Sequence, residues 1–85
     1  MNNDQQYSLL KSFGAVVRQR RQEMGLSQEE LAAKAGLNRT YIGDIERGTR
    51  NVALVNIFRL ALALEIKPSF LLMSIEKRVR KTGGR

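Results

Sequence analysis

The chain has 85 residues, the size of one small domain with a single modest core. Fifteen Lys and Arg against eight Asp and Glu give a formal net charge of +7. This charge suits a protein that binds a polyanion, because neutralising phosphates releases counterions. The alternative is a solvated basic surface without such a partner. The absence of His and Cys excludes disulfides, thiol nucleophiles, His-dependent triads and most zinc sites.

The first predicted helix covers residues 9–24. Its apolar residues recur at helical spacing, with arginines between them; they are Leu9, Leu10, Phe13, Val16, Val17 and Met24. Asp4 or Ser8 is expected to cap the start of the helix. Gly14 weakens the helix locally by about 1 kcal/mol relative to Ala. Gly25 stands where a left-handed cap ends a helix.

Two short helices joined by a glycine turn are predicted next. Ser27 and Glu30 have the spacing of a capping box, and Gly36 ends the first of these helices. Asn38 is placed to cap the second. The residues expected to face inward are Leu31, Ala32, Ala35, Ile42 and Ile45. This arrangement is typical of a helix-turn-helix, whose second helix presents side chains to the major groove of DNA.

A fourth helix is predicted after a loop, with Asn51 as its candidate cap. Its expected inward residues are Leu54, Ile57, Leu60, Ala61 and Leu64. Pro68 begins a fifth helix, because Pro is well accommodated at the first helical position. The sequence thus predicts an all-α, compact five-helix domain over residues 1–76. A basic tail at residues 77–85 either adds non-specific attraction to DNA or is a disordered end.

The last two predicted helices carry more apolar side chains than one small core can cover. One row on the fourth helix is separate from the inward stripe, and residues 70–73 of the fifth are apolar on every side. Such patches usually mark an interface, although a fully covered helix in an unusual packing is the alternative. The expected dimer interface consists of Val55, Phe58, Leu62, Leu72 and Met73.

Three segments occur in the order and spacing of a known family. They are Phe13–Arg21, Gly25–Ala32 and Ile45–Gly48, and they resemble the phage-repressor or Cro-type (Xre-type) helix-turn-helix DNA-binding proteins. The resemblance covers roughly residues 9–72. Within the family, residues 38–51 are similar to the controller proteins of restriction–modification systems, which are small single-domain dimers. The same recognition sequence also occurs in other Xre-type regulators.

The resemblance implies that the second helix of the motif reads DNA bases. The expected base-reading residues are Arg39, Thr40, Gly43 and Asp44. An Arg can make a bidentate contact with guanine O6 and N7, and Thr40 can meet a thymine methyl or a phosphate. Asp44 is either an acceptor for cytosine N4 or a brace for Arg39 or Arg47. Gly43 either permits close approach to DNA or only weakens the helix.

The family also implies phosphate contacts around this helix, which fix register without specifying sequence. The residues expected to make them are Gln28, Asn38, Tyr41, Arg47, Thr49, Arg50 and Asn51; a solvated surface, or partial burial for Tyr41, is the alternative. In the family, an Arg at the position of Arg21 pairs with the Glu that closes the recognition helix. Arg21 and Glu46 are therefore expected to form a structural ion pair.

The function predicted from the sequence is a transcriptional regulator that binds palindromic double-stranded operator DNA as a homodimer. A restriction–modification controller is the finer prediction, and RNA polymerase is a further candidate partner. The alternative is an antitoxin-type interaction protein that binds a toxin and its own operator. No enzymatic activity, cofactor, metal or small-molecule ligand is expected. Without a secretory pattern or a run near the ~18 apolar residues of a membrane span, the expected location is the cytoplasm of a bacterium, on nucleoid or phage DNA.

Overall fold

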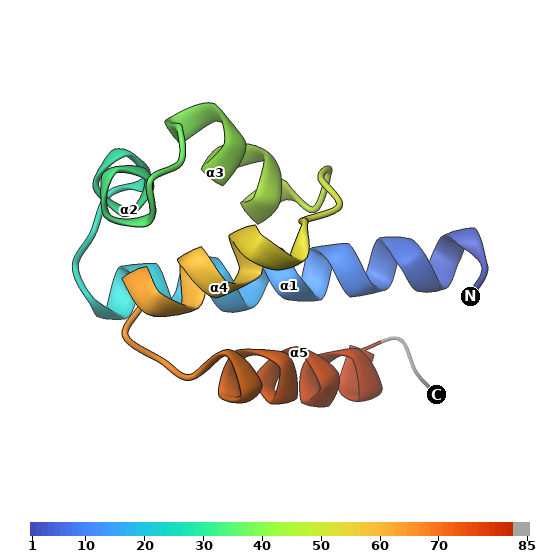
Figure 1. The fold of residues 1–85 in the computed structure, drawn as a ribbon. Helices are drawn as coiled ribbons and strands as arrows, with labels where there is room; N and C mark the ends of the chain where they lie inside the picture. Colours follow the sequence, from blue (N-terminus) through green and yellow to red (C-terminus); the bar gives the residue numbers. More distant parts are fainter. Residues whose placement is uncertain (83–85) are drawn as a thin grey trace.

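The computed structural model describes residues 1–82 and consists, over that range, of five helices without strands. They are α1 (Asn3–Glu23), α2 (Gln28–Ala35), α3 (Arg39–Arg47), α4 (Leu54–Ala63) and α5 (Pro68–Thr82). Helix α1 runs the length of the molecule, with α2 and α3 on one side and α5 on the other (Figure 1). No helix within residues 1–82 has both the length and the apolar content needed to cross a membrane. The predicted all-α, five-helix fold is confirmed over the described residues.

All five helices contribute side chains to the hydrophobic core. The largest fully buried ones are Val17, Leu31, Ile42, Ile45, Leu60, Leu64 and Leu71. Burying a side chain of this size stabilises the fold by roughly 1.5–3 kcal/mol relative to leaving it exposed. Helix α3 packs on α1 and α2, and α5 packs on α1 and α4. The core therefore fixes the position of α3 from two sides.

The ends of α2 and α3 are set by their own residues, as predicted. The Ser27 hydroxyl accepts from the Glu30 amide at 3.0 Å, and the Glu30 carboxylate accepts from the Ser27 amide at 2.8 Å. Gly36 ends α2 in the left-handed region at φ +70°, a conformation that costs glycine no steric strain. The Asn38 side chain then caps α3 by accepting from the Tyr41 amide at 2.8 Å.

Two predicted helix starts are wrong. Helix α1 begins at Asn3 and is capped by Asn2, whose side chain accepts from the Gln5 amide at 2.8 Å, so neither Asp4 nor Ser8 is the cap. Helix α4 follows Ala53, which makes no side-chain cap, rather than Asn51. Leu54, expected to face inward, is 67% exposed. Cα–Cβ bonds tilt toward a helix N-terminus, so the Leu54 side chain in the first turn of α4 is directed beyond the core.

The basic C-terminal segment differs from the predicted tail. Helix α5 continues to Thr82, so the expected domain boundary at residue 76 lies within a helix. Val79 packs against the core, which gives the extra turns a buried contact. Residues 83–85 of the predicted tail lie outside the described residues.

Candidate nucleic-acid interface

Helix α3 has one buried face and one exposed face. Ile42 and Ile45 are completely buried against the core, whereas Arg39, Thr40 and Arg47 are exposed. This separation follows from the helical period, because residues three apart share a face. Since α1 and α2 hold the buried face, α3 presents its outer residues on a fixed support.

Gly43 lies between Thr40 and Arg47 on the outer face of α3, where the side chains of Arg47 and Gln28 cover it. It is buried, and a Cβ built on it would lie 3.3 Å from Arg47 Nη1 and 3.8 Å from Gln28 Oε1. The missing side chain thus leaves room for the Arg47 guanidinium to lie across the helix.

Asp44 holds two arginines at the end of α3. Its Oδ1 accepts from Arg47 Nη2, and its Oδ2 accepts from Arg50 Nη2 at 3.1 Å. The predicted brace for Arg47 is confirmed, while Arg50 takes the place of Arg39 as the second partner. One carboxylate therefore orders the two guanidinium groups that were expected to contact phosphates.

The loop after α3 is ordered by contacts with that helix, which is itself hydrogen-bonded to α4. The Thr49 hydroxyl donates to the Asp44 carbonyl at 3.1 Å, and the Arg50 guanidinium lies over the Tyr41 ring, 4.9 Å from its centroid. Asn56 Nδ2 donates to the Tyr41 hydroxyl at 3.1 Å. Asn56 was not among the predicted site residues, although it is one of only two polar residues in α4, which was a signal that could have indicated it.

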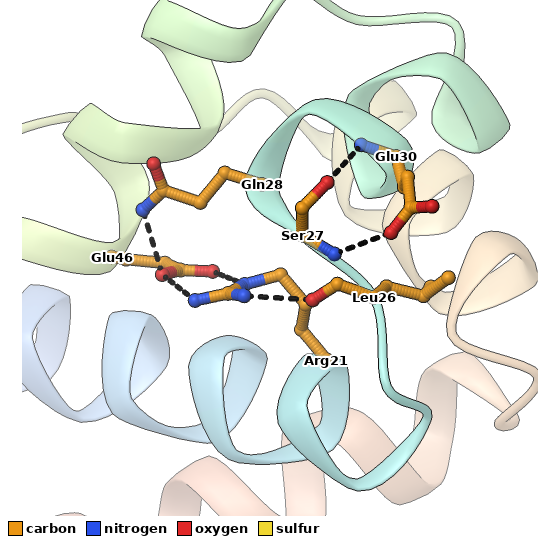
Figure 2. A network of polar contacts seen from close by, with 6 residues as sticks. All are labelled: Arg21, Leu26, Ser27, Gln28, Glu30 and Glu46. Carbon is orange, nitrogen blue, oxygen red and sulfur yellow. Dashed lines mark hydrogen bonds and ion pairs between the residues drawn. The ribbon is translucent and has the colours of Figure 1, made fainter.

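The predicted ion pair between Arg21 and Glu46 is present and shielded from solvent (Figure 2). Arg21 Nε donates to Glu46 Oε2 at 2.7 Å, and Nη2 donates to Oε1 at 3.0 Å. The side chains are only 11% and 4% exposed. The hydrogen bond to Glu46 raises the pKa of the Arg21 guanidinium, although burial opposes the change. The bidentate pair therefore joins α1 to α3 with both groups charged.

The same network reaches the start of α2. Arg21 Nη1 donates to the Leu26 carbonyl at 2.8 Å, and Gln28 Nε2 donates to Glu46 Oε1 at 3.0 Å. Figure 2 shows Gln28 pointing toward Glu46. Gln28 thus braces Glu46 near the end of α3, and its phosphate contact stays a prediction.

The residues expected at a dimer interface are all exposed on α4 and α5. Their exposed fractions lie between 46% for Met73 and 74% for Leu62. Leu54 and Phe70 are exposed as well, so these two helices carry more surface apolar residues than predicted. A surplus of exposed apolar side chains of this kind usually marks an interface.

Comparisons with known proteins agree with this geometry. The helix-turn-helix family model matches residues 17–71. Control protein C.BamHI of Bacillus amyloliquefaciens is 54% identical over 61 residues, which are 71% of this chain and 75% of that protein. The crystal structure of the restriction-modification controller protein C.AhdI from Aeromonas hydrophila matches with a TM-score of 0.71 and 55% identity, over 73% of this chain and 94% of that one.

A third match is a protein–DNA complex. The restriction-modification controller protein C.Esp1396I, solved as a tetramer with its natural 35 base-pair operator, has a TM-score of 0.76 and 34% identity over 84% of this chain and 93% of that one. Together with the buried Arg21–Glu46 pair and the exposed face of α3, these matches establish the family. The chain belongs to the helix-turn-helix family, and the restriction–modification controller proteins are its relatives within it.

Proposed function

We propose that this protein is a transcriptional regulator that binds operator DNA as a homodimer, in the manner of a restriction–modification controller. The observation that carries the proposal is the exposed face of α3, which has Arg39 and Thr40 at its start and Arg47 at its end. The major groove of B-DNA is about 12 Å wide and admits one α-helix. C.Esp1396I, a relative of known structure, is bound to its operator.

Base reading is assigned to the exposed start of α3. Arg39 donates to guanine O6 and N7, and Thr40 contacts a thymine methyl or a phosphate. Asp44 is the acceptor available for cytosine N4 once its arginines turn to DNA. Gly43 leaves space for Arg47 in the unbound protein, and its missing side chain permits a close approach to DNA.

Phosphate contacts are assigned to the residues around the two ends of α3. Arg47, Arg50, Thr49 and Asn51 lie at its exit, and Asn38, Gln28 and Tyr41 lie near the starts of α3 and α2. The net charge of +7 supports backbone contacts, because each phosphate neutralised by Lys or Arg releases counterions. These contacts set the register of the protein on DNA, and base contacts set the sequence.

Replacing Arg39 and Arg50 separately tests the proposed function. Arg39→Ala is expected to lose about 1–3 kcal/mol on the preferred duplex and to relax discrimination at one guanine per half-site. Arg50→Ala is expected to weaken all duplexes similarly and to reduce the salt slope by about one unit. Binding isotherms at several salt concentrations measure both. Equal weakening of specific and scrambled DNA by Arg39→Ala would contradict the assignment.

The dimer is assigned to the apolar surface of α4 and α5. A lone recognition helix reads only a few base pairs, so a two-fold dimer is needed to read two half-sites. Exposed Phe58, Leu62 and Leu72 offer the apolar area for that contact, with Val55 and Met73 beside them. RNA polymerase is proposed as a further partner of the DNA-bound dimer, because a controller acts on transcription at promoters.

Charged residues at the proposed interface are expected to separate the subunits. Leu62→Glu combined with Leu72→Glu should give a folded monomer, because both side chains are exposed in the single chain, and its affinity for a two-half-site duplex should collapse. Sedimentation measures the mass and circular dichroism the helicity. Tyr7→Glu, at an exposed aromatic residue on α1, is the control that should remain a dimer. A charged variant that still dimerises would disprove this placement.

The comparisons favour the regulator over the antitoxin, because the relatives found include control proteins and a phage immunity repressor. The carboxylates that could suggest catalysis, Asp44 and Glu46, are both paired with arginines, which gives them structural explanations. We accordingly place the protein's action on DNA in the bacterial cytoplasm, at the nucleoid.

A further inference from the structure

We propose that Asp44 is a specificity-determining residue whose carboxylate takes the place of DNA phosphates on Arg47 and Arg50 in the unbound protein. DNA must displace this carboxylate to use both arginines. The exchange weakens binding to every sequence, and the operator compensates for it by offering the released carboxylate a base donor. This inference rests on the proposed function, since it assigns α3 to the major groove.

The geometry shows a carboxylate occupied on both oxygens. Asp44 Oδ1 and Oδ2 each accept from a different guanidinium, and the Asp44 side chain is 20% exposed against 64% for Arg47 and 49% for Arg50. The carboxylate is thus the more shielded partner. Both arginine side chains are more exposed than the carboxylate, so an approaching phosphate can reach them first.

Contacts around the two arginines keep them in place. Gly43 leaves the space that the Arg47 guanidinium occupies, and the Tyr41 ring lies under the Arg50 guanidinium. The Thr49 amide and hydroxyl both donate to the Asp44 carbonyl, at 3.0 and 3.1 Å. These contacts and the Asp44 carboxylate together hold the two arginines in place.

The Asp44 carboxylate lowers the net positive charge that Arg47 and Arg50 would have alone. One carboxylate between two guanidinium groups leaves a net charge of +1 where two cations face the proposed DNA surface. Phosphates within the screening distance of roughly 8–10 Å are repelled by the carboxylate. Because counterion release drives non-specific binding, Asp44 lowers the affinity for arbitrary DNA.

The compensation at the operator depends on sequence. Cytosine presents its N4 amino group in the major groove, and a carboxylate is a suitable acceptor for it. Guanine presents only acceptors there, and thymine an acceptor and a methyl group, so a released carboxylate facing either one is left unpaired. Adenine has an amino donor as well, but its N7 acceptor lies beside that donor and repels a carboxylate. An unpaired charged group at an interface is costly. The operator therefore binds more tightly than a duplex that offers the carboxylate no donor.

Asp44→Asn tests the proposal, because it keeps the shape of the side chain and removes its charge. Its dissociation constants should be compared with those of the wild type on the preferred duplex and on a scrambled one, over a series of KCl concentrations. Binding to scrambled DNA is expected to tighten by about 3–10-fold, with a salt slope steeper by about one unit. Discrimination between the duplexes should fall by about 10-fold or more, chiefly at one cytosine per half-site.

Two controls separate this role from a structural one. Glu76→Gln makes the same charge change at an exposed residue of α5 and should leave discrimination unchanged. Asp44→Ala serves as a second variant should the Asn form not fold, and it should also tighten scrambled binding. If Asp44→Asn weakened binding to both duplexes equally, or left the ratio of their dissociation constants unchanged, this inference would be overturned and the proposed function would stand. A wild-type protein without any preferred duplex would overturn the proposed function and this inference with it.

Discussion

Gly14→Ala is expected to destabilise the domain by about 3 kcal/mol or more, although Ala is the better helix former. A Cβ on Gly14 would lie 2.3 Å from the Ile45 carbonyl oxygen and 2.7 Å from that of Glu46. Both atoms belong to the backbone of α3 and cannot move aside as a flexible side chain can. The substitution would push α1 from α3, which disturbs the core and the Arg21–Glu46 pair. The gain of about 1 kcal/mol from helix propensity is too small to offset this.

Gly43→Ala is the matched control for this prediction. A Cβ there would lie 3.3 Å from Arg47 Nη1, the end of a flexible and exposed side chain. The arginine can shift, so the stability of Gly43→Ala is expected to stay within about 1 kcal/mol of the wild type. Denaturant unfolding measures both variants. A Gly14→Ala protein as stable as Gly43→Ala would show that α1 and α3 do not approach this closely.

Removing either partner of the Arg21–Glu46 pair is expected to cost about 3–5 kcal/mol, because the remaining charge would be shielded and uncompensated. Replacing Arg21 would also remove the hydrogen bond to the Leu26 carbonyl, and replacing Glu46 would remove the one from the Gln28 amide. The double replacement should be less damaging than the sum of the singles. Because the pKa of Arg21 is raised above a value that is already high, its stabilising contribution is expected to persist through ordinary alkaline pH.

The exposed pair between Lys34 and Glu65, 3.3 Å apart, is the control for the buried one. Replacing Lys34 with Ala should change the free energy of unfolding by less than about 1 kcal/mol. If Arg21→Ala and Glu46→Ala each lowered the free energy of unfolding by less than about half a kcal/mol, and their effects were additive, the pair would contribute no more than an exposed surface pair. That result would contradict the prediction.

The local structure of the motif could be predicted because its determinants lie close together in the chain. Ser27 and Glu30 satisfy each other's backbone amides, and Asn38 caps the helix that follows it. Arg21 and Glu46 lie 25 residues apart, and their pairing was expected only from the family resemblance. Spacing within a helix gives no information about which distant side chain a charge will meet.

The features that escaped prediction depend on contacts between separate segments. Gly14 was counted only as a weak point of its helix, whereas it lies against the backbone of α3. Arg50 reaches back to Asp44 and Tyr41 from the loop, and a loop conformation has no periodicity to indicate this. Leu54 matched the inward period of α4 but lies beyond the core, because periodicity defines a face and not where the core ends.

The most direct test of sequence-specific binding by a two-fold dimer is selection of duplexes from a random pool by the wild-type protein at a fixed salt concentration. The selected sequences should contain two inverted half-sites, each with a conserved guanine for Arg39. Their centres should lie about one helical turn apart, roughly 34–36 Å, or a multiple of that distance. A pool that stays random, or one enriched in a single unpaired half-site, would contradict the proposed function.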